Sequence, residues 1–219
     1  LIDFVPAGLD LWLIGSIDHS IRDGRMRIGV TGYRVQGEAD SRQLVGYDLV
    51  DTRAGGANID EAAALFLQDL DAAGIPLDSI DQWVGDRSTT DRAHLVVRDN
   101  REFMRAVLRA LRTPRWIPKD ANGRPLPQSS VKVPRPLYEI KTPRKWNGSS
   151  WHNMAQMRSA MGSKPPRLFI MRSCKHVIQD FQRWDGRKAS RHKDGLDRLG
   201  YSWETAHRRY HLWRQGGWK

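Results

Sequence analysis

Apolar and polar positions along the first fifty residues predict three antiparallel strands. Residues 11–17 are mostly apolar, as in a buried strand, and run into Asp18, His19 and Ser20. Asp23-Gly24 is a hairpin-turn signal, and residues 26–35 then alternate between apolar and polar types. Residues 43–50 have strand character again after a polar stretch. We therefore expect a three-stranded meander.

The rest of the chain alternates between predicted helices and strands. Helical spacing covers residues 58–73, 100–111, 149–161 and 173–184, and short strands are predicted at 81–85 and 167–171. We expect Ser173 to cap the helix that it begins, and Asp194 to open a final helix that extends to about residue 213. This order predicts an α/β fold, in which a mixed central sheet of three antiparallel and then parallel strands is flanked by helices.

Residues 113–143 differ in amino-acid composition from the predicted elements around them. Seven prolines lie between residues 113 and 143, and Asn122-Gly123 is a second hairpin signal. Residues 116–117 and 131–133 could form the two arms of a basic β-hairpin, and residues 137–141 a further strand. We interpret residues 113–148 as an insertion within a single domain.

Charge is divided unevenly between the two halves of the 219-residue chain. The net charge is +11, but residues 1–97 carry −8 and no lysine, whereas residues 98–219 carry +19. A strongly basic half usually contacts a polyanion. We expect nucleic acid and no membrane, because the sequence has no long amphipathic basic helix and no apolar span.

Basic residues in and near the insertion alternate with Trp146 and Trp151, a pattern typical of nucleic-acid contact. Cations neutralise phosphates, and aromatic rings stack on exposed bases or sugars. The alternative is a solvated basic face with the tryptophans in the core. No base-reading motif is present, so we expect double-stranded DNA to be bound with little sequence specificity. The candidate DNA-binding residues are Lys132, Arg135, Lys141, Arg144, Lys145, Arg191 and Lys193.

Cysteine and histidine give little support to a disulfide framework or a zinc site. Cys174 is the single cysteine, which fits a reducing cytoplasm. His207 and His211 are four residues apart on the last predicted helix, but no third ligand is near them in the sequence. The apolar stretch at residues 9–17 is too short to span a membrane and lacks the basic flank of a signal peptide.

Three aspartates stand at comparable places in the predicted elements. Asp18 ends the first strand, Asp86 ends the fourth, and Asp194 begins the final helix. If strands one and four are neighbours and the helix crosses the sheet, the three carboxylates converge and repel one another unless cations are bound. Hard oxygen ligands suit Mg²⁺ or Mn²⁺. Two such ions can activate a water and stabilise the leaving oxygen in phosphodiester hydrolysis.

Each acid also has a structural interpretation. Asp18 could be a turn residue, Asp86 a loop acid paired with a neighbouring arginine, and Asp194 a helix cap. Asp10 is an alternative to Asp18 if the strand begins earlier. Asp197 shares a helix face with Asp194, so it is either an accessory metal ligand or the partner of a cation.

Four segments, in order, resemble the nuclease domain of the large terminase subunit of tailed bacteriophages. Residues 13–20 and residues 80–88 each contain a predicted strand that ends in an acid. Residues 167–184 contain a predicted strand and a helix that ends near an aromatic residue, and residues 192–197 contain the start of the last helix. Members of that family often have His-Asp-Asp in the fourth segment. Asp194 then matches the second acid, and Lys193 replaces the first.

The resemblance covers most of the chain and implies an RNase H-like fold and a metal-dependent endonuclease. Such an enzyme cuts concatemeric phage DNA during genome packaging, with two Mg²⁺ or Mn²⁺ ions. Asp18, Asp86 and Asp194 would be catalytic, and Asp197 would be a further metal ligand. The implied partners are the portal protein, the small terminase subunit and the ATPase domain of the same chain, in the host cytoplasm.

Large terminase subunits couple this nuclease to an N-terminal ATPase domain. The sequence contains no Gly-Lys dipeptide, and so no P-loop, and it begins with Leu. We therefore expect residues 1–219 to be a single nuclease domain from a longer protein, without the ATPase domain. The alternatives are another RNase H-like enzyme, such as a junction resolvase or a transposase, and a non-catalytic DNA-binding or motor-assembly module. A transposase would normally have Glu in place of Asp194.

Overall fold

The computed structural model of the protein describes residues 1–5, 8–20, 25–38, 41–54, 59–85, 93–111, 140–141, 149–185 and 192–214. Most of the predicted insertion, and with it the predicted basic hairpin, lies outside these ranges. The elements are β1 (Trp12–Ser20), β2 (Arg25–Gln36), β3 (Gln43–Ala54), α1 (Ile59–Ala72), η2 (Leu77–Ser79), β4 (Gln82–Gly85), α2 (Ala93–Leu111), β5 (Ile140–Lys141), α3 (Ser149–Gly162), β6 (Leu168–Ile170), α4 (Lys175–Arg183) and α5 (Asp194–Arg214).

A six-stranded mixed sheet in the order β5-β4-β1-β2-β3-β6 forms the centre of the molecule. β1, β2 and β3 make the predicted antiparallel meander, and β4, β5 and β6 each pair in parallel with a neighbour. β4 lies directly beside β1, with Gly85 opposite Ile17. The predicted α/β class and the adjacency of the first and fourth strands are both confirmed.

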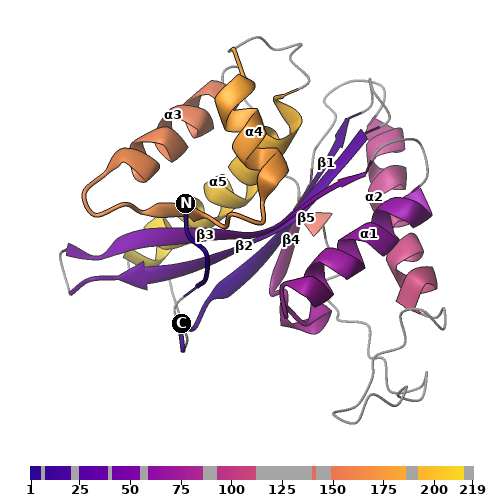
Figure 1. Cartoon of the computed structure of the whole chain (residues 1–219), viewed down its shortest axis with the longest axis horizontal. Coiled ribbons are helices and arrows are strands. Elements are labelled where there is room, and N and C mark those ends of the chain that lie inside the picture. The colour runs from indigo at the N-terminus through magenta and orange to yellow at the C-terminus, as the bar shows by residue number, and fades with distance from the viewer. Residues whose placement is uncertain are drawn as a thin grey trace.

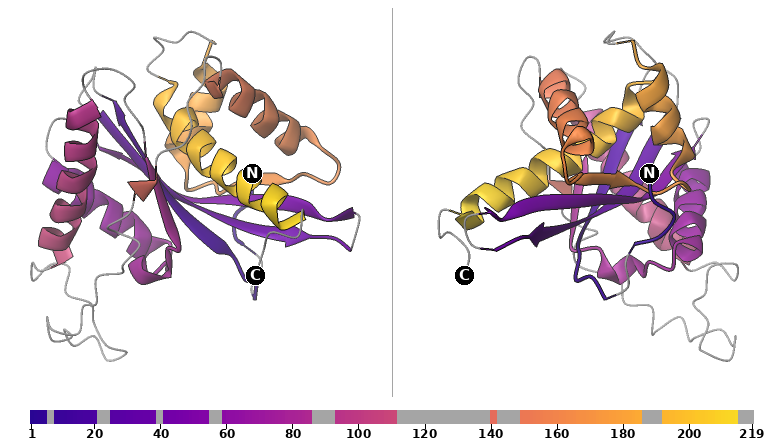
Figure 2. Two further views of the ribbon diagram at one scale, coloured as in Figure 1. Left: turned by 180° about the vertical axis from the view of Figure 1, so that it is seen from behind. Right: turned by 60° about the vertical axis from the view of Figure 1, so that its left-hand side comes forward.

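Helices cover both faces of the sheet, as Figures 1 and 2 show: α1 and α2 on one face, and α3, α4 and α5 on the other. Alternation along β1 assigns residues to the two faces, because successive side chains in a strand point in opposite directions. Ile17 belongs to the core cluster under α1 and α2, together with Phe66 and Phe103. Ile14 belongs to the cluster under α5, together with Trp203.

Several predicted boundaries differ from the structure. β3 continues to Ala54, and α2 begins at Ala93 instead of residue 100. α4 begins at Lys175, and the residue before it makes no side-chain capping hydrogen bond, so the prediction that Ser173 caps this helix is wrong. The carboxylate of Asp51 on β3 instead accepts a 2.7 Å hydrogen bond from the backbone N–H of Val177 in the first turn of α4. None of the described helices is long and apolar enough to cross a membrane.

Candidate functional site

Asp18 is a buried carboxylate on a central strand of the sheet. It is 5% exposed and lies opposite Arg27 of β2 in the antiparallel register. Its neighbour Ile17 points to the apolar layer under α1 and α2, so Asp18 points to the face that α5 crosses. β1 runs two residues beyond Asp18, to Ser20, so Asp18 lies within the strand and not at its end.

The first turn of α5 brings two further carboxylates to this face. Asp194 is the first residue of the helix, and Asp197, 9% exposed, follows one turn later. Acidic side chains are favourable here because the N-terminal end of a helix carries a partial positive charge. The structure thus supports the helix-start interpretation of Asp194, which is compatible with a role as a metal ligand.

The ammonium of Lys193 lies among these acids. It forms an ion pair with Asp197, while the backbone N–H of Asp197 donates to the Lys193 carbonyl at 2.8 Å. Burial alone would lower the pKa of Lys193, but the attraction of Asp197, Asp18 and Asp194 outweighs burial and raises that pKa above its ordinary value. Asp18 of β1 and Asp194 of α5 therefore both lie within electrostatic reach of one cation.

The other predicted ligand, Asp86, lies outside the described residues. Gly85, the residue before Asp86, ends β4 opposite Ile17, the residue before Asp18. Four predicted DNA contacts in the insertion, Lys132, Arg135, Arg144 and Lys145, are also outside the described part of the chain, as is Arg191. Lys141 is described, and it is exposed on β5 at the edge of the sheet.

A buried network of ion pairs lies beneath the start of α5. Arg198 donates to both carboxylate oxygens of Asp48, at 3.0 and 2.9 Å, and reaches Asp51 at 3.5 Å. Arg27 donates to Asp180 of α4 at 2.7 Å and also reaches Asp51 at 3.5 Å. Burial would lower the pKa of Arg198, but the two aspartates raise it, so this guanidinium remains charged. The network joins β2, β3, α4 and α5.

A β-bulge in β3 orients the two strand carboxylates of this network. Val30 pairs with Val50 and Thr31 pairs with Asp48, so Leu49 is an extra residue without a partner in β2. In a regular strand, residues 48 and 51 would point to opposite faces. The extra residue brings Asp48 and Asp51 to the same face, where both meet Arg198.

The network also fixes how closely the first turn of α5 approaches the sheet. A Cβ atom on Gly195 would lie 2.3 Å from both Arg27 Nη2 and Asp180 Oδ2, so the helix packs directly against this ion pair. His192, just before the helix, contacts Asp180 through Nδ1 at 3.2 Å. His192 and Gly195, which lie on either side of Lys193, therefore both pack against Asp180 of α4.

Sequence reasoning missed this network, although part of its signal was visible. Asp48 and Asp51 lie in a largely buried strand, and a buried polar residue needs a partner. The partner Arg198 lies 150 residues from Asp48 along the chain, and no local pattern identifies it. Asp197, for which a cation was one of the two expected partners, pairs with Lys193.

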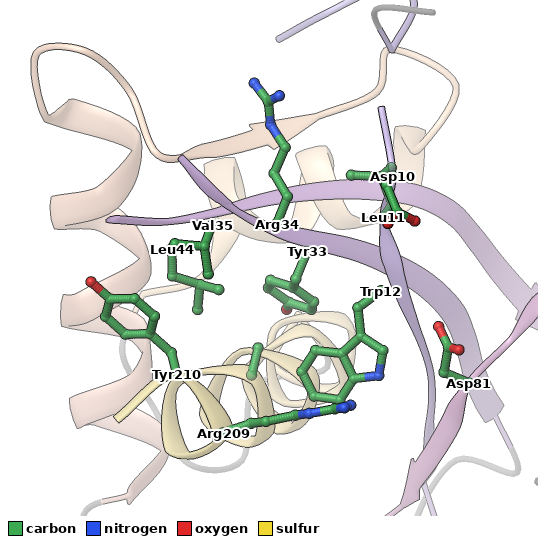
Figure 3. Close-up of a pocket in the computed structure, with 11 residues that line it drawn as sticks. Asp10, Leu11, Trp12, Tyr33, Arg34, Val35, Leu44, Asp81, Arg209 and Tyr210 are labelled. Carbon is green, nitrogen blue, oxygen red and sulfur yellow. The ribbon is translucent and has the colours of Figure 1, made fainter. Parts of the chain in front are cut away.

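Asp10, which the sequence offers as an alternative to Asp18, lies far from these acids. Asp10, the alternative to Asp18, precedes β1 and lines a pocket of about 540 Å³ with Trp12, Tyr33 and Arg209 (Figure 3). The guanidinium of Arg209 lies 4.0 Å from the centroid of the Trp12 ring. Trp12 begins β1 and is six residues before Asp18, which corresponds to about 20 Å along a strand. Asp10 and Asp18 therefore belong to opposite ends of the sheet.

The His207–His211 pair does not form a metal site with any other described residue. The two ring centroids are 6.0 Å apart, and the His207 ring packs on Trp203 at 4.5 Å. Burial, followed by the nearby His211 and Arg167, lowers the pKa of His207 to about 4. His207 is therefore a neutral packing residue on α5 at neutral pH.

The side chains of Asp18, Asp194 and Asp197 have the donor chemistry that suits a divalent ion. Carboxylate oxygens are the ligands that Mg²⁺ and Mn²⁺ prefer, and Asp18, Asp194 and Asp197 supply them. Across the described ranges, no group of three or more His, Cys, Asp or Glu side chains is disposed to hold a metal ion. Asp197 is paired with Lys193.

No protein-family model matches the sequence, and no curated protein matches it. Among solved structures, the Mn-soaked nuclease domain of the human cytomegalovirus terminase is similar, with a TM-score of 0.51 and 10% identity over 95% of this chain and 89% of that chain. An inhibitor-bound form of that domain gives a TM-score of 0.43, with 10% identity over 90% of this chain and 81% of that chain.

The Thermus thermophilus RuvC structure is also similar, with a TM-score of 0.39 and 11% identity over 91% of this chain and 96% of that chain. Sequence identities this low establish only the fold. The assignment of the fold rests on the Mn-soaked cytomegalovirus domain, whose TM-score is 0.51. The chain has an RNase H-like α/β fold, which the cytomegalovirus terminase nuclease domain shares.

Proposed function

We propose that this chain is the metal-dependent endonuclease domain of a DNA-packaging terminase, which cuts concatemeric phage DNA. One observation carries the proposal: Asp18 lies on the face of the sheet that α5 crosses, and the first turn of α5 carries Asp194 and Asp197. Acids from two distant segments of an RNase H-like fold thus belong to the same face of the sheet, which supports the proposal. The similar cytomegalovirus domain is a terminase nuclease that was soaked with Mn.

In this proposal Asp18, Asp86 and Asp194 hold Mg²⁺ or Mn²⁺, with Asp197 beside them. A bound divalent ion supplies Lewis-acid activation for phosphodiester hydrolysis. The chain positions these acids: Asp18 belongs to a strand that is paired on both sides, and the helix turn that begins with Asp194 packs against the Arg27–Asp180 ion pair. The basic half of the chain binds the DNA backbone, and the portal protein, the small subunit and an ATPase domain act with it in the host cytoplasm.

Nicking of supercoiled plasmid with Mn²⁺ tests the assignment. We expect Asp18→Asn, Asp86→Asn and Asp194→Asn each to lower the rate about a hundredfold or more, because each removes a ligand charge. Asp60→Asn is the matched control, since Asp60 is an exposed carboxylate paired with Arg109 on α2.

Full activity of folded Asp18→Asn protein would refute the site. Preferential cutting of four-way junctions over linear duplex would instead indicate a resolvase. Binding of DNA without any cutting, in the presence of Mg²⁺ or Mn²⁺, would indicate a non-catalytic module.

A further inference from the structure

Trp151 is an exposed aromatic residue in the first turn of α3. It is 50% exposed, and its ring centroid lies 4.9 Å from that of Trp184, with an angle of 47° between the two ring planes. Trp184 is 8% exposed and belongs to the core cluster under α5. Trp184 therefore supports the Trp151 ring from the protein side, and the exposed half of Trp151 is accessible to a ligand.

The start of α3 packs beside the start of α5. Asn153, two residues after Trp151, donates to the backbone carbonyl of Gly200 at 3.4 Å. Gly200 is six residues after Asp194, the first residue of α5, which corresponds to about 9 Å along a helix. Trp151 thus lies beside the first two turns of α5.

The end of α4 brings Trp184 to the same place. The backbone N–H of Trp184 donates to the Asp180 carbonyl, one turn earlier, at 2.9 Å. The carboxylate of Asp180 contacts His192, just before α5, at 3.2 Å. The Trp151–Trp184 pair therefore joins α3 to α4 next to the acidic first turn of α5, on the face of the sheet that these three helices share (Figure 1).

The surface around the tryptophan pair is basic. Residues 149–184 contain six Lys and Arg residues and a single acid, Asp180. Asp180 is 6% exposed and paired with Arg27, so its charge is compensated inside the protein. Arg158 of α3 and Arg183 of α4, by contrast, are exposed. The outer surface of this segment is thus complementary to a polyanion.

The combination of one exposed ring with cations is typical of a site for unpaired nucleotides. The cations neutralise phosphates, and the ring stacks on a base. Bases within a duplex stack on one another, so a protein ring can stack only on a base that has left the duplex or belongs to a single strand. Within residues 149–184, all of which the structure describes, Trp151 is the one exposed large apolar side chain, so this surface has no apolar patch for a protein partner.

We propose that Trp151, supported by Trp184, stacks on an unpaired base of a DNA strand, so that α3 and α4 bind single-stranded DNA beside the start of α5. The inference rests on the proposed function in taking DNA as the ligand, and it requires no bound metal. The base contact carries no sequence information, because every base has a face on which a ring can stack.

Fluorescence anisotropy with labelled strands of about 12 nucleotides, in EDTA and with the whole 219-residue chain, tests this inference. One strand is oligo(dT), and the other has the same length and charge but consists of abasic sites. Stacking of one base corresponds to about a 5- to 150-fold gain in affinity. We expect the wild type to prefer oligo(dT) by at least about fivefold, and Trp151→Ala to lose that preference. Trp151→Phe should keep most of it, because the ring remains.

Arg158→Ala is the matched control on the same helix. It removes an exposed cation and no ring, so it should leave the ratio of the two affinities unchanged, even if both affinities fall. A fully paired duplex of the same length provides a second control. Trp151→Ala should bind this duplex as tightly as the wild type, because paired bases are not accessible to the ring.

Thermal unfolding shows whether each variant is folded, and Trp151→Leu, which removes the ring and keeps an apolar side chain, replaces Trp151→Ala if the latter is unstable. Equal affinities of the wild type for oligo(dT) and the abasic strand would overturn the inference. A folded variant without the ring that keeps the wild-type preference would do so too, and would assign Trp151 to another partner. Continued nicking of plasmid with Mn²⁺ would leave the proposed nuclease intact in both cases, whereas loss of nicking together with loss of DNA binding would overturn the proposed function as well.

Discussion

Replacing Arg198 by methionine tests whether the buried ion pairs hold α5 on the sheet. The Arg198 side chain is 0% exposed, and it donates two hydrogen bonds to Asp48, which is also 0% exposed. Arg27 also reaches Asp51 at 3.5 Å, so Asp48 is the carboxylate that loses its cation in the variant. Removing one partner of a buried pair costs about 3–5 kcal/mol, because the remaining charge is uncompensated.

Urea unfolding at pH 7, followed by tryptophan fluorescence, measures this loss. We expect the free energy of unfolding to fall by about 3–5 kcal/mol in Arg198→Met and by about 1 kcal/mol or less in the exposed control Arg208→Met. The double variant Asp48→Asn/Arg198→Met should recover part of the loss, since it removes the uncompensated charge.

The loss should also depend on pH. Burial raises the pKa of Asp48 above its ordinary 3.8, and Arg198 opposes that shift, so the pKa rises further in the variant. A carboxyl group with a raised folded-state pKa is stabilising when protonated, and this contribution is lost as the pH rises through that pKa. The difference between wild type and Arg198→Met should therefore shrink as the pH falls from 7. A pH-independent loss below about 1 kcal/mol would refute the assignment of a buried, charged pair.

Two further substitutions test the packing and titration of α5 by urea unfolding. Gly195→Ala should destabilise the protein by about 1–3 kcal/mol, because its Cβ would lie 2.3 Å from Arg27 Nη2 and Asp180 Oδ2. Gly200→Ala on the same helix, whose Cβ would meet no atom closer than 3.4 Å, should instead gain up to about 1 kcal/mol; equal stabilities would contradict this packing. His207 has a folded-state pKa of about 4 against an ordinary 6.5, so its contribution to stability is present above pH 6.5 and should decrease by up to about 3 kcal/mol as the pH falls toward 4. His207→Gln should remove this part of the pH dependence, and an unchanged profile would contradict it.

Local patterns predicted the order and adjacency of the elements well. The alternation in β2 and the turn signal before it predicted the meander, and a strand that returns after a helix normally lies parallel to an earlier strand. β4 indeed pairs with β1. The start of α5 at Asp194 was predicted because Asp is favoured at helix starts.

Contacts between distant segments could not be predicted in this way. β3 was expected to end at residue 50 but continues to Ala54, although the two-residue alternation is broken at Leu49 and Val50 and Asp51 is polar. Both irregularities depend on contacts with distant residues. The bulge places Leu49 and Val50 in the same apolar cluster, which breaks the alternation. Arg27 and Arg198 compensate the charge of the buried Asp51. The Lys193–Asp197 pair has helical spacing, but its proximity to Asp18 depends on how α5 crosses the sheet.

The bulge at Leu49 has a consequence for insertions and deletions. Deleting one residue from a regular strand turns every later side chain to the opposite face of the sheet. β3 already carries one residue more than β2 requires, so deleting Leu49 would restore one-to-one pairing and leave Asp48 and Asp51 on the face of α5. Thr52, whose hydroxyl donates to Asp69 of α1, would keep its face as well. At this one position, β3 can change its length by a residue without exchanging its two faces.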